Sequence, residues 1–140
     1  MANTFGAQMT KLRVSPFKNP DPGFVDGGVQ VFNEAVTLNS QAIADTITVA
    51  RLPKGAIPLY GVLLSSVSLG TAVISIGVAG DAAKYRAGAV FNTPNVPTMF
   101  GLAAANGEAL AAEEDVIITI ATAALPASGT LRVMFFYAIN

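Results

Sequence analysis

The sequence lacks three residue types that carry much of protein chemistry: its 140 residues include no cysteine, no histidine and no tryptophan. Without cysteine the fold cannot rest on disulfides, so burial and hydrogen bonding must stabilise it. Without histidine and cysteine there is no imidazole general base, no thiolate nucleophile and no zinc site of the usual ligands. We therefore expect a protein that is not an enzyme and that uses no cofactor and no metal.

Charge is also scarce. Charged residues make up 12% of the chain and hydrophobic residues 52%, against a usual charged share of about 25%. The formal net charge of −1 gives no basic footprint for nucleic acid, so we expect no nucleic-acid partner. So few charges leave much of the surface to small and hydroxyl-bearing residues, which suits a protein that works inside an assembly.

The few charges are unevenly distributed along the chain. Residues 1–20 carry Lys11, Arg13 and Lys18 and no acid, a charge of +3, whereas residues 21–140 carry five basic and nine acidic side chains, 5 − 9 = −4. Three prolines between positions 16 and 22 favour extended backbone. We expect residues 1–22 to form an extended basic arm, either lying along an acidic partner surface or kept soluble as a tail, and residues 23–140 to form one domain.

Residues 55–80 contain no charged side chain and are long enough to raise the question of a membrane helix. The segment is interrupted by Pro58, five serine or threonine residues and five glycines, and its flanks lack basic clusters. It is better described as two buried strands joined by a turn at residues 68–71. Residues 1–20 also lack the apolar stretch of a signal peptide. We therefore expect no membrane span and no secretion by that route.

Alternation of apolar and polar residues predicts a series of strands separated by glycine and proline turns. The expected strands lie within residues 23–38 and at 45–50, 56–68, 72–79, 84–91, 115–121 and 131–139. No long helical periodicity is present. Six to eight strands of this kind are typical of an all-β fold, and we predict a single-domain, jelly-roll-like β-sandwich with an extended N-terminal arm.

Some segments leave local alternatives open. Gly61 is a candidate for a bulge or bend in a long strand, and residues 82–86 could form a helical turn. Residues 92–112 form a long irregular connection, of the length that functional loops have, in which residues 102–105 could form a short helix. The strands at 115–121 and 131–139 are predicted to pair as a hairpin.

Three clusters are candidate sites. The carboxylates at 113–115 could bind a cation or a basic arm, but successive residues of a strand face opposite ways, which favours a solvated charged edge. The run Lys84–Arg86 could stack on nucleic acid, although without other basic support the signal is weak. Phe135 and Phe136 must point to opposite faces, so one of the two is a candidate interface anchor.

Three stretches carry a family resemblance: Ala-Arg-Leu-Pro-Lys-Gly-Ala at 50–56, Gly-Thr-Ala followed by Ile-Ser-Ile-Gly at 70–77, and Ala-Leu-Pro-Ala-Ser-Gly-Thr-Leu at 124–131. They resemble small structural proteins of tailed bacteriophages, in particular the cement (capsid decoration) proteins of podophages such as one of Bordetella. The resemblance covers most of the chain from about Ala50 onward. Its motifs are turn and strand patterns rather than catalytic signatures.

The resemblance implies a jelly-roll protein, made in the host cytoplasm, that binds the outer surface of the virion capsid as a homodimer, with a trimer left open. The implied partner is the major capsid protein, whose contacts it would stiffen. Charge and irregularity, rather than the family, single out our candidate contact residues: Lys11, Arg13, Phe17, Lys18, Arg51, Lys54 and Phe100. The alternative is a small β-sandwich module that binds a ligand or carbohydrate, for which the few aromatic residues leave the chain poorly equipped.

Overall fold

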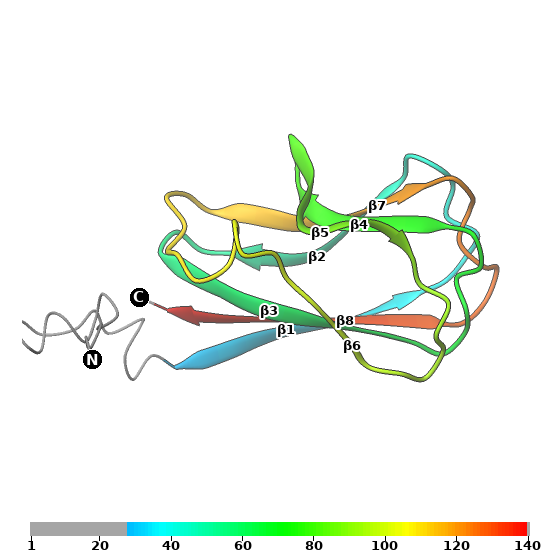
Figure 1. The fold of residues 1–140 in the computed structure, drawn as a ribbon, viewed down its shortest axis with the longest axis horizontal. Helices are drawn as coiled ribbons and strands as arrows, with labels where there is room; N and C mark the ends of the chain where they lie inside the picture. Colours follow the sequence, from blue (N-terminus) through cyan, green and yellow to red (C-terminus); the bar gives the residue numbers. More distant parts are fainter. Residues whose placement is uncertain (1–27, 140) are drawn as a thin grey trace, which may run out of the picture.

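The computed structural model describes residues 28–139, and Figure 1 shows them as two layers of strands. Eight strands follow one another along the chain: β1 (Val29–Thr37), β2 (Thr46–Leu52), β3 (Ala56–Ser65), β4 (Val73–Val78), β5 (Asp81–Val90), β6 (Thr98–Phe100), β7 (Glu114–Ala121) and β8 (Thr130–Ile139). They form two four-stranded sheets, ordered β1-β8-β3-β6 and β2-β7-β4-β5. All pairs are antiparallel.

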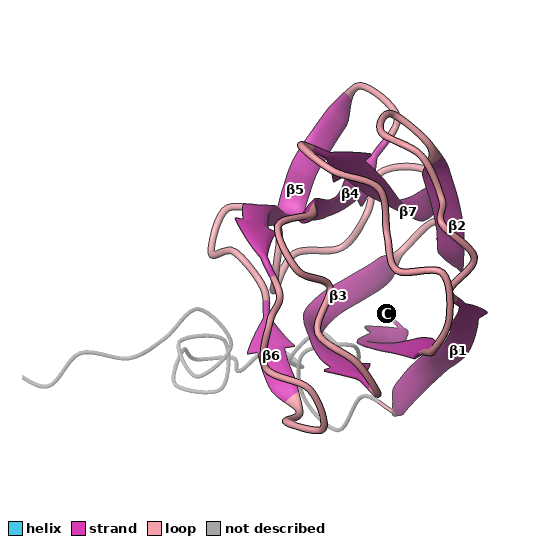
Figure 2. Cartoon of the chain, turned by 90° about the vertical axis from the view of Figure 1, so that its right-hand side faces the viewer, coloured by secondary structure: helices cyan, strands magenta, loops and turns pink. Residues whose placement is uncertain are grey.

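The pairing is nested from the ends of the described chain inward. Strand β1 pairs with β8, β2 with β7, β3 with β6, and β4 with β5. A long β-hairpin of this kind, wrapped so that successive pairs alternate between two sheets, is the jelly roll. The end-on view of Figure 2 shows the result, with β1, β3 and β6 in one layer and β2, β4, β5 and β7 in the other. The predicted all-β, jelly-roll-like sandwich is confirmed.

The predicted hairpin of the last two strands is wrong. Strand β7 pairs with β2 and β4, whereas β8 pairs with β1 and β3 in the opposite sheet. The segment between them crosses from one layer to the other, and its backbone bonds to the β1–β2 connection through Leu125 N–H to the Gln41 carbonyl at 3.0 Å. Strong alternation in two consecutive strands predicted their existence correctly, but alternation alone does not identify a strand's partner.

Smaller expectations also changed. The register shift in β3 lies between Pro58 and Tyr60, which makes Leu59 the extra residue, so the bulge is not at Gly61. Residues 82–86 belong to strand β5 rather than to a helical turn, and residues 102–105 form turns instead of a short helix. The irregular segment contains the short strand β6, which the sequence pattern had not predicted. No helix in the described part of the chain could cross a membrane.

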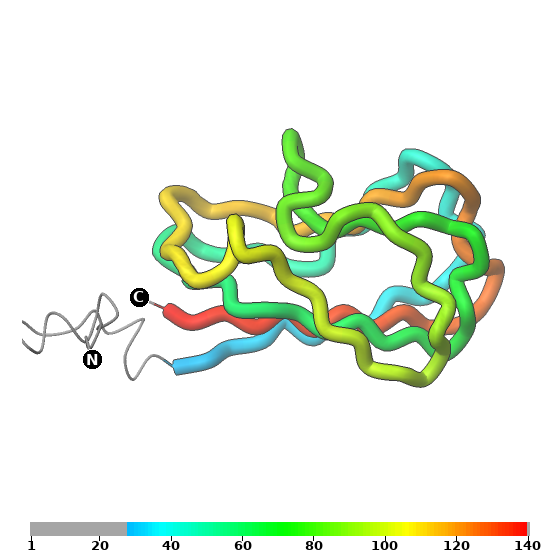
Figure 3. The backbone as a smooth tube through the Cα atoms, viewed as in Figure 1, coloured from blue at the N-terminus to red at the C-terminus, as the bar shows by residue number. Residues whose placement is uncertain are grey.

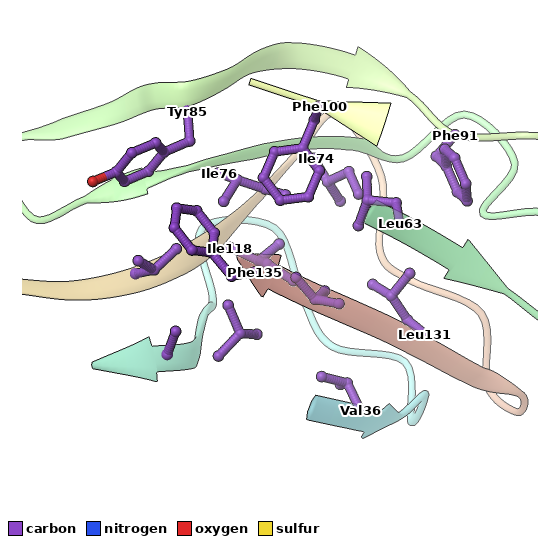
Figure 4. Packing of buried hydrophobic residues seen from close by; sticks show 14 of the residues in the cluster. Val36, Leu63, Ile74, Ile76, Tyr85, Phe91, Phe100, Ile118, Leu131 and Phe135 are labelled. Atoms are coloured by element: carbon purple, nitrogen blue, oxygen red, sulfur yellow. The ribbon is translucent and has the colours of Figure 1, made fainter. Parts of the chain in front are cut away.

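The core fills the space between the two sheets, as the close-up in Figure 4 shows. Phe135 from β8 is 1% exposed and lies at the centre, with the Tyr85 ring edge-on at 4.9 Å and the Phe100 ring at 6.1 Å. Gly61 supplies the space for Phe100, since a β-carbon at position 61 would overlap the end of that ring. The absence of a side chain there is a packing requirement of the core.

The β4–β5 hairpin rises out of its sheet, as Figures 1 and 3 show. The pairing of these strands shifts register twice. Only glycine fits at position 77, because the β-carbon of any other residue would meet the Asp81 carbonyl. The Arg86 guanidinium donates hydrogen bonds to the main-chain carbonyls of Ile74, Ala89 and Val90, which holds the bent strands together. Its burial lowers the pKa of this guanidinium from its ordinary value.

Candidate interaction surface

The outer face of the sheet β1-β8-β3-β6 is apolar. Residues directly opposite each other on antiparallel strands share one face, so the register gives its composition. Val31 lies opposite Phe136, which lies opposite Tyr60. In the next row Met134 lies opposite Val62, and Val62 opposite Met99. We call this set the apolar face: Val31, Tyr60, Val62, Met99, Met134 and Phe136.

Its side chains are partly or largely open to solvent. Met99 is 69% exposed and Val31 is 48% exposed, and the remaining members are half-buried. The Tyr60 and Phe136 rings stack with their centroids 4.7 Å apart. Among the outward-facing residues that these strand pairs define, Arg132 carries the single charge, and its guanidinium donates to the Asn33 amide oxygen at 2.8 Å. A contiguous apolar surface with aromatic residues and methionine marks an interaction site.

A shallow hollow continues the apolar face beyond β6. It has a volume of about 300 Å³, and Tyr60, Met99, Phe100 and Leu102 contribute to its lining. Leu102 is itself 40% exposed. The Asn106 amide oxygen is buried at this hollow and has no hydrogen-bond partner among the described residues. The lining of the hollow is mainly apolar, so the hollow is suited to an apolar group.

The outer face of the second sheet has a different chemistry. Thr119 of β7 lies between Thr46 of β2 and Ser75 of β4, and Ile117 lies between Thr48 and Gly77. We call this second set the hydroxyl face: Thr46, Thr48, Ser75 and Thr119, with the aliphatic Ile117 beside them. Hydroxyl groups and small side chains are well hydrated, so this face does not need a cover.

The carboxylates at 113–115 do not converge. Arg51 makes a two-pronged ion pair with Asp115, with N–O distances of 2.7 and 3.1 Å, and lies 3.9 Å from Glu113. Glu114 points the other way, where Lys84 Nζ binds it at 2.7 Å and the Tyr85 hydroxyl donates to it. Burial, with the bond to Glu114, raises the pKa of that hydroxyl. No group of three potential metal ligands occurs among residues 28–139.

The structure separates the residues that the sequence singled out. Lys11, Arg13, Phe17 and Lys18 lie outside the described residues. Lys54 is exposed in the β2–β3 turn, and Arg51 is exposed but bound to Asp115. Phe100 is 8% exposed and packs inward, so the side chain that β6 presents to solvent is its neighbour Met99.

The nucleic-acid interpretation of Lys84–Arg86 is wrong for these side chains. Tyr85 has no exposed surface and packs on Phe135, and Arg86 binds main-chain carbonyls. Of Phe135 and Phe136, which alternation places on opposite faces, Phe136 is the one that points outward, and it remains the candidate anchor. Sequence reasoning missed its neighbours Tyr60, Val62 and Met134. A strand with apolar residues on both faces does not reveal which of them point outward, because this depends on strand order and on the bulge at Leu59.

Comparisons with known proteins give structural neighbours only: no family model and no curated protein matches the chain. A chain of the cyanophage Pam1 capsid asymmetric unit superposes with a TM-score of 0.69 at 25% identity, over 91% of this chain and 97% of that one. A chain of the Ralstonia phage GP4 capsid gives 0.66 at 18% identity, over 81% and 86%. A chain of the Helicobacter pylori bacteriophage KHP30 capsid gives 0.50 at 11%, over 79% and 87%. This chain thus has a jelly-roll fold that proteins of phage capsids also have.

Proposed function

We propose that this chain is a structural protein of a phage virion, a cement or decoration protein that binds the outside of the capsid and stabilises contacts between major capsid protein subunits. The observation that carries the proposal is the apolar face, in a chain that is similar to capsid chains over most of its length. The resemblance to cement proteins of podophages, such as that of Bordetella, points to the same role.

The apolar face is suited to a protein partner. Its two stacked rings and two methionines are the residue types that are enriched at the centres of interfaces, where they lose water on binding. Burying such surface contributes about 25 cal/mol per Å² of apolar area. The near absence of charge on this face means that little desolvation of charged groups opposes docking.

The basic residues would add attachment points to this central contact. Lys11, Arg13 and Lys18 give residues 1–20 a charge of +3, and Lys54 is exposed at one end of the sandwich. Linking a charged segment to a docking face makes the second contact intramolecular, which raises the overall affinity without requiring either contact to be strong. A capsid protein with an acidic outer surface is the partner that this arrangement fits.

The test is co-sedimentation with expanded capsids of the same phage assembled without this protein. Full-length chain is compared with a chain that begins at Gly23, over a range of salt concentrations. We expect saturable binding of the full-length chain. We also expect weaker binding and a smaller salt dependence for the shortened chain, because three positive charges are removed.

Failure of both chains to bind would overturn the cement proposal. Binding by both chains with equal affinity and equal salt dependence would retain the docking face but remove the role proposed for residues 1–22. A capsid without this protein should also release its genome at a lower temperature than the complete particle, because bound ligand stabilises the state that it binds.

A further inference from the structure

The two sheets have four edge strands, and three of them are protected against pairing with another chain. Strand β6 has only three residues. Strand β2 shifts register between Thr48 and Ala50, and β5 shifts register twice beside the projecting hairpin. Short edges and bulges are the devices by which sheets avoid edge-to-edge association.

Strand β1 has none of these protections. It pairs with β8 over all nine residues without a register shift, and it contains no proline, lysine or arginine. Glu34 is its single charged residue, and Val29 and Val31 are 61% and 48% exposed. Figure 2 shows β1 at the end of its layer opposite β6. Within the described residues, β1 is therefore the edge best able to accept another strand.

We propose that β1 pairs antiparallel with β1 of a second copy, so that the two four-stranded sheets become one sheet of eight strands. The proposal deepens the proposed function, on which it rests, by naming the surface through which two copies join. A twofold axis opposite Asn33 gives the longest overlap and pairs all nine residues. It places Val31 opposite the partner's Ala35 and keeps Glu34 away from the partner's Glu34, where like charges would repel.

A second copy fits this edge for a geometric reason. The twofold axis of an antiparallel pair is perpendicular to the sheet, so the apolar faces of both copies point to the same side. The row formed by Val31, Phe136 and Tyr60 reaches β1 itself, where Val31 would lie against the partner's Ala35. One dimer therefore presents both apolar faces to a single underlying surface, which an edge-paired capsid strand would not achieve.

The same geometry separates the two N-terminal segments. Residues 1–27 precede β1 in each copy, and antiparallel pairing makes them leave at opposite ends of the strand pair. Nine residues of strand span about 30 Å, and 27 residues can extend by at most about 90 Å. A dimer of this form can therefore reach separate capsid subunits on its two sides.

The chain contains no cysteine, so single substitutions report on proximity without background. Asn33→Cys lies on the predicted axis, where the Cα–Cα distance of about 4.5–5.5 Å between paired strands allows a disulfide. We expect the full-length variant to form a covalent dimer on mild oxidation at least about tenfold faster than Thr48→Cys, a control at the edge of the other sheet, because the two thiols are held together.

A second variant tests the interface without a cross-link. Ala35→Lys adds to β1 a charge of the kind that natural edge strands use against pairing. We expect wild-type chain to have twice the 14.3 kDa monomer mass in sedimentation equilibrium, and this variant to have the monomer mass with an unchanged circular dichroism spectrum.

A monomeric wild-type chain, or equal cross-linking of Asn33→Cys and Thr48→Cys, would overturn the proposal. The β1 edge would then be covered by something other than a second copy, such as capsid protein or residues 1–27. The co-sedimentation assay separates this result from failure of the proposed function. Capsid binding by a monomer overturns the β1 interface alone, whereas a β1-linked dimer that does not bind capsids overturns the cement role alone.

Discussion

The two sheets of the sandwich are alike on the inside and unlike on the outside. Their inner faces supply one continuous core, in which Tyr85 of one sheet packs edge-on against Phe135 of the other. Their outer faces differ: one sheet carries the apolar face with Tyr60 and Phe136 stacked on it, and the other carries the hydroxyl face with Thr119 between Thr46 and Ser75. The fold requires only the first of these properties.

This difference shows which surface needs an explanation outside the chain. The hydroxyl face shows that the fold can be made with side chains that water solvates well. Rings and methionines on the opposite face contribute little to the core, so holding them in water has no benefit for the isolated domain. The proposed function gives them the role of capturing another surface, and this is why it rests on that face.

The largest expected effect on stability comes from a substitution in the core that the two inner faces share. Phe135→Ala removes the ring that joins Tyr85 and Phe100 at the centre of the core. We expect the free energy of unfolding to fall by about 3–5 kcal/mol, the usual cost of replacing a buried phenylalanine by alanine. Urea unfolding followed by circular dichroism measures it.

The adjacent residue provides the control for that experiment. Phe136 is half-buried on the apolar face and packs on Tyr60, so Phe136→Ala should lower the free energy of unfolding by only about 1 kcal/mol. Equal losses for the two substitutions would show that the apolar face belongs to the folding core, and the distinction between the inside and the outside of this sheet would be wrong.

An intermediate effect is expected from replacing one aliphatic residue by serine on each of the two outer faces. Val62 and Ile117 are both half-buried aliphatic residues that point outward from interior strands of their sheets. We expect Val62→Ser to weaken capsid binding by about tenfold or more, equivalent to about 1.4 kcal/mol, because it places a hydroxyl at the centre of the docking surface. Ile117→Ser should bind as wild type does.

Both variants should unfold at similar urea concentrations, so a change in binding alone identifies the face that docks. The co-sedimentation assay with empty capsids measures it. If Ile117→Ser reduced binding more than Val62→Ser, the docking surface would lie on the hydroxyl face and the proposed orientation on the capsid would be reversed.

The sequence predicted the strands well because alternation is a local property. Alternation along the predicted strand 115–121 places Val116, Ile118 and Ile120 on one face, and all three are buried. The partners of each strand were not predicted, since pairing joins residues far apart along the chain. This is why alternation alone predicts a β7–β8 hairpin, although the two strands lie in opposite sheets.

The candidate site was harder to predict for a related reason. Every strand of a sandwich has apolar residues on its core side, so Tyr60 and Val62 do not differ from core residues by type. The bulge at Leu59 determines that Tyr60 points outward with Phe136. Pro58 and Gly61 flank that bulge in the sequence, but neither residue fixes its position. Charge, in contrast, is visible without the fold, and it led to Arg51 and Lys54 instead of the apolar face.

The smallest expected effect concerns the Arg51–Asp115 pair, the ion pair between adjacent strands of the second sheet. The guanidinium hydrogen bonds hold the pKa of the Asp115 carboxyl below its ordinary value of 3.8. A carboxyl whose folded-state pKa is lowered stabilises the fold above the unfolded-state pKa, and this contribution is lost as the pH falls through the folded-state pKa.

Because both side chains are largely exposed, the pair is screened by salt and its contribution to stability is small, so the pKa is the sensitive observable. We expect carboxyl-carbon NMR titration to show a higher Asp115 pKa in Arg51→Gln than in wild type, and capsid binding of that variant at moderate salt to stay within about twofold of wild type. An unchanged Asp115 pKa would show that Arg51 is not bound to this carboxylate in solution. A large loss of binding with a raised pKa would instead show that Arg51 contacts the capsid, as its charge first indicated, and would extend the docking surface from the apolar face to the edge of the second sheet.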